Sequence, residues 1–235
     1  MKKTCLILLI IAGSNPLSAQ TSAIAGQLLP AAETTWLTDS VRQVFRLSYP
    51  VRSIYHYTDQ SGNYYCVFTQ SRDSVGQQRD TFHYRIRAVN LKRAENGQYS
   101  KVWDMNDYVL QKDQSELNIW FWDQYISFED LDKDGMIDPL IVYGTATNGG
   151  GVRNGRVKCM IFYKGEKIGV RHQNGLQDAE RNTTIDKAFY SMPAPLQSAV
   201  SQRMEAMVKK QEAVFSSGWQ KAMKGKRTYF DEKNQ

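Results

Sequence analysis

An acidic run in the middle of the chain constrains the fold more than any other feature. Its carboxylates occupy positions 1, 3, 5 and 9 of the run: Asp130, Asp132, Asp134 and Asp138. Gly135 stands at position 6, where a calcium-binding loop turns sharply. Residues 125–128 and 139–143 on either side are rich in aromatic and β-branched side chains, which favour strands. The sequence therefore predicts a calcium loop that joins two strands.

The run matches a short form of calcium site. A helix-flanked loop would place a bidentate Glu at position 12, where this chain has Ile141. The shorter form predicts five oxygen ligands, from the four aspartates and the backbone carbonyl of Met136. An all-oxygen set favours calcium over zinc, which prefers nitrogen and sulfur. The alternative is a solvated acidic turn without metal. Because no His lies close in sequence, a bound ion is expected to be structural.

Alternating apolar segments separated by turn signals predict a series of strands. They cover residues 52–58, 64–71, 81–92, 99–103, 115–128, 139–144, 156–163 and 167–171. Helical spacing predicts helices over residues 33–47 and 195–215, and residues 174–191 are polar and irregular. These elements predict an α+β fold: an antiparallel β meander with an N-terminal helix and a C-terminal helical segment.

The first residues have the features of a secretory signal peptide. Lys2 and Lys3 precede an apolar stretch, residues 5–12, and Ala19 offers a cleavage point before Gln20. A secreted or periplasmic bacterial protein follows, and no later segment is long and apolar enough for a membrane helix. The predicted organisation is a signal peptide over residues 1–19, a flexible leader over 20–32 and a single α+β domain over 33–235.

The charge of the chain indicates the kind of partner. Removal of Lys2 and Lys3 with the signal peptide lowers the formal net charge from +6 to +4. A modestly basic secreted chain favours an anionic surface glycan or an envelope protein as partner, and nucleic acid is not expected outside the cytoplasm. The basic C-terminal end, residues 221–227, could contact such a partner or form a solvated helix face.

Two cysteines, Cys66 and Cys159, remain after signal cleavage. An oxidising compartment permits a disulfide between them, provided that the fold brings their Cα atoms within bonding reach. Each alternates with apolar neighbours on a predicted strand, so two buried free thiols are the alternative.

An aromatic peak at Trp120 and Trp122 is a candidate ligand-binding feature. On a strand these two rings share one face. An exposed pair would form a stacking platform for sugar rings, whereas a buried pair would belong to the core.

The densest polar stretch supplies the candidate catalytic residues. His172 lies close in sequence to three charged residues: Asp178, Glu180 and Arg181. A His beside two carboxylates can act in acid–base catalysis when the groups converge. The alternative is a hydrogen-bonded loop that caps the sheet.

Five stretches of the chain carry a resemblance to a known family: residues 55–66, 128–144, 163–175, 178–183 and 217–219. They are similar to a family of secreted proteins of Gram-negative bacteria that carries the label surface polysaccharide biosynthesis. The resemblance implies a cellular association and assigns no catalytic residues. The acidic run alone resembles the calcium loops of integrin-type propeller repeats. It occurs once, and a propeller needs several copies.

Taken together, the sequence predicts a secreted or periplasmic, non-enzymatic protein with one structural calcium loop. It would associate with surface polysaccharide or the cell envelope through binding. The alternative is an enzyme that acts on surface polysaccharide and uses His172, Asp178 and Glu180.

Overall fold

The fold is known from a computed structural model of the 235-residue chain, which describes residues 24–75, 81–110 and 116–234. The predicted signal peptide, residues 1–19, lies outside the described residues. The described chain consists mostly of antiparallel strands with few helices, so the predicted α+β class is confirmed.

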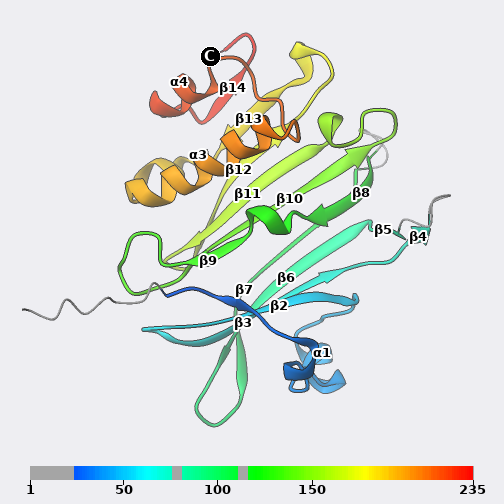
Figure 1. Cartoon of the computed structure of the whole chain (residues 1–235), viewed down its shortest axis with the longest axis vertical. Coiled ribbons are helices and arrows are strands. Elements are labelled where there is room, and N and C mark those ends of the chain that lie inside the picture. Colours follow the sequence, from blue (N-terminus) through cyan, green and yellow to red (C-terminus); the bar gives the residue numbers. More distant parts are fainter. Residues whose placement is uncertain (1–23, 76–80, 111–115, 235) are drawn as a thin grey trace, which may run out of the picture.

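The strands form two main sheets, which lie towards opposite ends of the molecule and meet in its middle (Figure 1). The first sheet contains, in spatial order, β1 (Gln27–Leu28), β2 (Val51–Asp59), β3 (Gly62–Gln70), β6 (Arg85–Arg93) and β7 (Tyr99–Tyr108). The second contains β14 (Tyr229–Asp231), β13 (Asn182–Ile185), β12 (Glu166–Gln173), β11 (Arg156–Tyr163), β10 (Asp138–Thr147) and β8 (Glu116–Phe121). Three further strands are short. β9 (Ser127–Glu129) pairs with β10, and β4 (Ser74–Val75) pairs with β5 (Thr81–Phe82) in a separate two-stranded sheet.

Strand β10 connects two of the hydrophobic cores because its side chains alternate between the faces of the second sheet. Ile141 and Tyr143 join the inter-sheet core, which also holds Phe68 of the first sheet. Leu140 and Val142 point the other way, into the helix-side core. A strand that is buried on both faces reads as a continuous apolar run, as residues 139–143 do.

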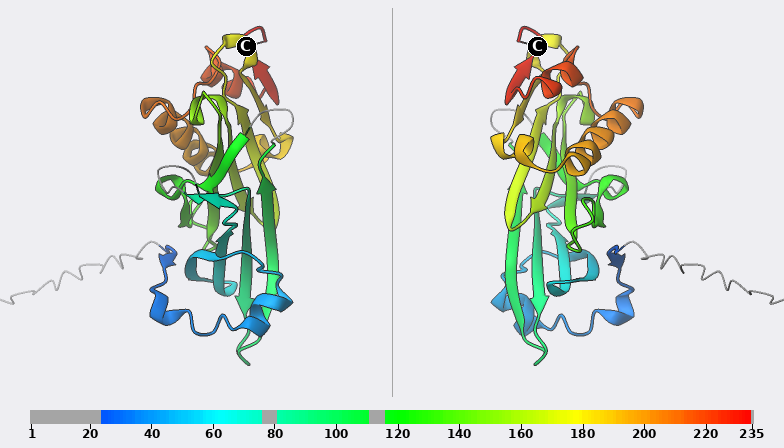
Figure 2. Two further views of the ribbon diagram at one scale, coloured as in Figure 1. Left: turned by 90° about the vertical axis from the view of Figure 1, so that its right-hand side faces the viewer. Right: turned by 90° about the vertical axis from the view of Figure 1, so that its left-hand side faces the viewer.

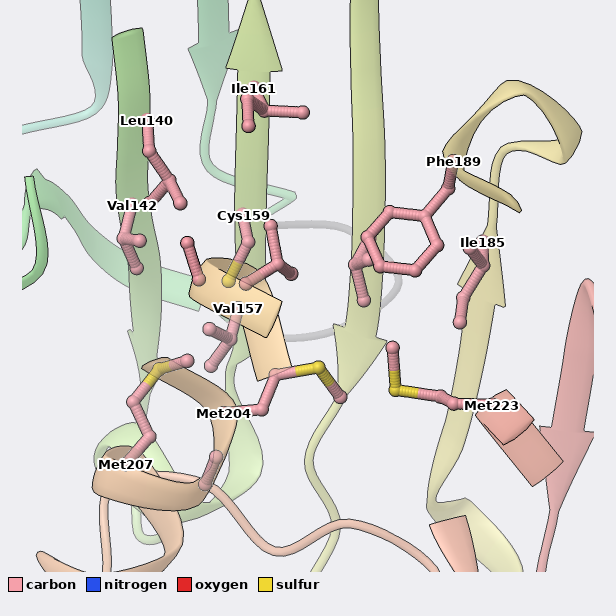
Figure 3. Close-up of a cluster of buried hydrophobic side chains, with 14 of the residues drawn as sticks. Leu140, Val142, Val157, Cys159, Ile161, Ile185, Phe189, Met204, Met207 and Met223 are labelled. Atoms are coloured by element: carbon pink, nitrogen blue, oxygen red, sulfur yellow. The ribbon is translucent and has the colours of Figure 1, made fainter. Parts of the chain in front are cut away.

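The helix-side core is covered by α3 (Ala194–Lys209) and α4 (Trp219–Lys224). Apolar residues of α3 recur at steps of three and four and are buried: Leu196, Val200, Met204 and Met207. Figure 3 shows Met204 and Met207 below Cys159 and Val157, and Met223 below Phe189 and Ile185, all in one buried cluster. In Figure 2 these helices lie at the end of the molecule opposite the blue N-terminal segment.

The N-terminal segment covers the outer face of the first sheet. The ring centroid of Trp36 lies 4.7 Å from that of Tyr65 and 4.7 Å from that of Tyr99. The centroids of the two tyrosine rings are 5.8 Å apart. Leu47 is buried beside Ile54 in the outer core. This face of the sheet is therefore closed by irregular chain rather than by a long helix.

Part of the predicted flexible leader, residues 20–32, forms a strand. Gln27 and Leu28 form β1 and pair with β2, while Gly26 donates to the carbonyl of Phe128 at 2.7 Å. Ile24 packs against the inter-sheet core. Small residues, Gly26 and Pro30 give the segment the composition of a linker, but an exposed strand edge supplies it with hydrogen-bond partners.

Both predicted helices are shorter in the structure. In place of residues 33–47, α1 covers Asp39–Val44, because Thr38 caps its start and Arg46 leaves the helix at φ 54°. In place of residues 195–215, α3 ends at Lys209, and Gln211 turns the chain at φ 60°. The turn lets Ala213 and Phe215 pack into the helix-side core.

Several strands also differ from the prediction. Residues 115–128 form β8, a 3-10 turn (Asp123–Tyr125) and β9 instead of one strand, and both strands pair with different parts of β10. The irregular region 174–191 contains β13, whose polar residues Asn182–Ile185 pair with β12 and β14. A strand of four residues, three of them polar, lacks the alternation on which sequence patterns depend.

The two cysteines are free and buried. Cys66 lies in the inter-sheet core, whereas Cys159 lies in the helix-side core, on the other face of the second sheet. A disulfide is therefore not formed, and the alternative of two buried thiols describes them.

Candidate metal centre

Three of the four predicted aspartate ligands converge in the loop between β9 and β10. One carboxylate oxygen from each of Asp130, Asp132 and Asp138 lies within 4.8 Å of the others. Such a spacing suits one hard cation with ligand distances near 2.4 Å. The donor set consists of carboxylate oxygens, which fit calcium better than zinc.

Backbone amides fold the loop around these carboxylates. Asp130 accepts from the amide of Asp134 at 3.1 Å and from that of Gly135 at 3.0 Å. Asp138 accepts from the amide of Leu131 at 3.0 Å. These bonds position the side chains before any ion binds, but each amide only partly offsets a full negative charge.

Asp138 is the most constrained ligand because its side chain is 2% exposed. Burial raises the pKa of its carboxyl to about 7, and the charges of Asp132, Asp134 and Asp130 act in the same direction. A cation beside this carboxylate would favour its ionised form. The residues present therefore fit a divalent ion.

The loop also contacts the first sheet, which the sequence did not predict. Ile137 donates its amide to a carboxylate oxygen of Asp59 at 3.1 Å, and Gln60 donates its amide to the carbonyl of Gly135 at 3.1 Å. Asp59 is the last residue of β2, and Gln60 lies in the turn between β2 and β3. The loop thus joins the two sheets as well as β9 and β10.

The remaining predicted ligands occupy other positions. Asp134 is outside the converging group, lies 3.7 Å from the Lys164 ammonium and accepts the amide of Met136 at 3.0 Å. Met136 therefore has its amide directed to a neighbouring side chain, and its role as a carbonyl ligand stays a prediction.

Substitution of Gly135 by alanine is expected to destabilise the protein by about 1–3 kcal/mol. Gly135 adopts φ +86°, and an added Cβ would stand 2.0 Å from Nε2 of Gln60. The Gln60 side chain can move aside, so the backbone conformation supplies most of the cost. Urea denaturation would measure the change. Gly97→Ala, at φ +82° with no atom within 4 Å, is the matched control for the left-handed backbone alone.

His172 is buried and fully hydrogen-bonded in the helix-side region. Its Nε2 lies 2.9 Å from Oδ1 of Asn174 and 3.1 Å from the Val214 carbonyl, and its Nδ1 lies 3.0 Å from the Thr183 hydroxyl. Two acceptors at Nε2 place the proton there, so Thr183 donates to Nδ1. Burial lowers the pKa of His172 to about 4. The ring is a neutral structural group with both nitrogens in use.

The other three candidate catalytic residues form their bonds with groups other than His172. Arg181 pairs with Asp178 at 2.6 Å, and Glu180 accepts the amide of Gln177 at 3.0 Å. Among the described residues no hydrogen bond or ion pair joins His172 to Asp178 or Glu180. The structure does not bring the four residues together, and the hydrogen-bonded-loop alternative describes them.

The tryptophan pair is mainly core. Trp122 is 3% exposed, and Trp120 packs against the same helix-side core. A Cβ added at Gly144 would stand 2.6 Å from the Trp122 ring, so the ring lies directly on the backbone of β10. An exposed stacking platform formed by both rings is therefore excluded by the burial of Trp122.

A buried ionic network escaped prediction. Glu116 of β8 is 1% exposed and accepts from Nε of Arg156 at 2.6 Å and from Nη2 at 2.7 Å. Arg156 lies 3.5 Å from Asp107 of β7, which also accepts from Lys158 at 2.6 Å. The network links the two sheets at the end of the inter-sheet core. Each of its cationic residues, Arg156 and Lys158, is 40 or more positions from each of its carboxylates, Asp107 and Glu116.

In comparisons with known proteins, no family model, no curated protein and no solved structure matches this chain. Within residues 24–75, 81–110 and 116–234, no helix has the length and apolar character needed to cross a membrane.

Proposed function

We propose that this is a secreted or periplasmic, non-enzymatic binding protein whose two sheets are fastened by one calcium ion. The observation that carries the proposal is the convergence of Asp130, Asp132 and Asp138 in a loop that also bonds to the β2–β3 turn. A cation at these oxygens would relieve the repulsion between the three carboxylates. It would thereby stabilise the junction of the sheets and the surfaces around it.

The proposed partner is an anionic surface glycan, with an envelope protein as the alternative. Support comes from the net charge of +4 after signal cleavage and from the resemblance to the surface-polysaccharide family. The proposal includes the finer description of the fold, an antiparallel meander with an N-terminal helix and a C-terminal helical segment. Binding is favoured over catalysis because the candidate catalytic residues do not converge.

Calcium at 10 mM is expected to raise the melting temperature by about 3–10 °C. Extracellular calcium modules bind the ion with Kd values of about 10⁻⁴ to 10⁻³ M, and at such an affinity this concentration adds about 1–3 kcal/mol. Differential scanning calorimetry in calcium and in EDTA would measure the shift.

Two variants make the calcium experiment specific. Asp132→Ala removes a converging ligand whose side chain is partly exposed and should abolish the shift. Glu166→Gln removes an exposed carboxylate at the start of β12 and should leave the shift unchanged. A melting temperature that stays constant across millimolar calcium would refute the metal site. A calcium-induced shift that is reduced equally in both variants would show non-specific screening of charge.

A further inference from the structure

A second site lies on the outer face of the first sheet. A groove of about 830 Å³ runs between residues 44–49, at and after the end of α1, and the adjoining parts of β6 and β7. Its volume falls in the range of about 300–1,000 Å³ that is typical of ligand sites. The acidic loop does not line it, so the groove is separate from the candidate metal centre.

The groove has an excess of positive charge. Four cationic side chains line it: Arg46, Arg85, Arg87 and Lys101. Two carboxylates also line it, but Asp107 is bound to Lys158 of the second sheet at 2.6 Å. Asp104 is shared by Arg87 at 2.7 Å and Lys101 at 3.3 Å. Asp104 therefore pairs with two of the four cations, and Arg46 and Arg85 are not neutralised by a carboxylate of the groove lining.

Arg46 and Arg85 are the two arginines that remain available. The Arg85 side chain is 58% exposed, and its nearest carboxylate, Asp73, is 3.9 Å away. Arg46 is exposed and forms no ion pair among the described residues. Its carbonyl accepts from Nη1 of Arg87 at 2.7 Å, which fixes the backbone at this point. A guanidinium presented in this way suits bidentate binding of a carboxylate.

Aromatic and polar side chains complete the lining. Phe45 and Tyr49 are half-buried, and Tyr108 is 57% exposed. Exposed or half-exposed rings offer faces to the C–H surface of a sugar ring, while Ser48 and Asn106 can exchange hydrogen bonds with hydroxyls. The groove therefore combines ring stacking, hydroxyl recognition and carboxylate recognition.

We propose that this groove binds an acidic oligosaccharide that carries uronate-type carboxylates. The inference rests on the proposed function, because it gives the anionic glycan partner a place on the molecule. Arg46 and Arg85 would bind the carboxylates, and the rings of Tyr49 and Tyr108 would pack against sugar faces. A flat anionic membrane surface has no sugar faces for these rings and would not fill a concave groove.

The backbone at Arg46 allows a charge to be removed without disturbing the fold. Arg46 follows α1 at φ 54°, and the amide of Leu47 bonds back to the carbonyl of Arg42 at 2.8 Å. Glycine is the residue favoured at such a position. Lys226 follows α4 at φ 56° in the same arrangement, and the amide of Arg227 bonds to the carbonyl of Ala222 at 3.1 Å. Arg46→Gly and Lys226→Gly are therefore matched variants, each with one charge fewer.

The test measures binding of hyaluronan oligosaccharides to the mature full chain in calcium at about 0.15 M salt, by biolayer interferometry or calorimetry. Neutral maltooligosaccharides of the same length and phosphatidylglycerol vesicles serve as comparison probes. Arg46→Gly is expected to weaken hyaluronan binding about tenfold, and Tyr108→Ala is expected to weaken it as well. Lys226→Gly should bind as the unaltered protein does, and thermal melting should show that all three variants are folded.

The outcomes separate the groove from the broader proposal. Hyaluronan binding that is lost in Lys226→Gly but kept in Arg46→Gly would overturn the groove and would place the glycan at the basic C-terminal end. Equal binding of maltooligosaccharides would overturn the carboxylate recognition. Vesicle binding without hyaluronan binding would overturn both the assignment of the groove as a glycan site and the proposal of a glycan partner. The calcium-dependent shift in melting temperature tests the metal site independently of these results.

Discussion

Replacement of Glu116 by alanine is expected to lower the free energy of unfolding by about 3–5 kcal/mol. The Glu116 side chain is fully buried and receives both Arg156 and the Thr145 hydroxyl, at 2.6 and 2.7 Å. Its removal leaves the Arg156 guanidinium, which is 13% exposed, with Asp107 at 3.5 Å as its remaining carboxylate. The cost arises mainly because the buried charge loses its two bonds to Glu116 and keeps only the longer contact to Asp107, and urea denaturation would measure it.

A double variant distinguishes a buried charge from lost packing. Glu116→Leu together with Arg156→Met removes both charges and should recover most of the stability lost in the single variants. Asp178→Ala is the matched control at an exposed pair, because Asp178 is 76% exposed and its bond to Arg181 is screened by water. Its expected cost is below about 1 kcal/mol. Similar costs for Glu116→Ala and Asp178→Ala would contradict this account of the network.

The contrast between the acidic loop and this network shows what the sequence could predict. The loop was predictable because Asp130, Asp132 and Asp138 lie within nine positions, so their convergence depends on local backbone geometry. Glu116 and Arg156 meet because β8 and β11 both pair with β10, which no local pattern specifies. The link from the loop to Asp59 has the same origin, since it requires the two sheets to be packed together.

The fold differs from the prediction for related reasons. Strong alternation located most of the long strands, but β1 and β13 were missed because strand pairing, rather than composition, makes them strands. Helix lengths were overestimated because apolar residues near Phe215 have helical spacing and yet pack after a turn at Gln211. Sequence periodicity indicates which residues are buried more reliably than it indicates the element that buries them.

Substitution of His172 by glutamine is expected to make stability less sensitive to acid. The native pKa of His172 is about 4, below its ordinary value of 6.5, because burial disfavours the charged ring. The unfolded chain therefore gains a proton near pH 6.5 that the native protein does not bind until about pH 4. The contribution of the neutral ring is complete above pH 6.5 and is lost as the pH falls to about 4, an effect of about 3 kcal/mol.

The measurement is the difference in unfolding free energy between the unaltered protein and His172→Gln at several pH values. Asp138 acts in the opposite direction, because its raised pKa makes the metal-free fold more stable as the pH falls from about 7. Because both proteins contain Asp138, its contribution cancels when their free energies of unfolding are subtracted. At pH 7 the variant should be less stable than the unaltered protein, because a glutamine side chain cannot reproduce the hydrogen bonds of the ring to Asn174 and Thr183. The gap should narrow by about 3 kcal/mol at pH 4.

Ile168→Val is the control for this difference, because Ile168 lies on the same strand and in the same core but carries no titrating group. Its cost of about 1 kcal/mol should not change with pH. A gap between the unaltered protein and His172→Gln that also stays constant from pH 7 to pH 4 would mean that the native ring takes up its proton as easily as the unfolded one. The ring would then be open to water, and the loop from Asp178 to Arg181 would again be a candidate for acid–base chemistry.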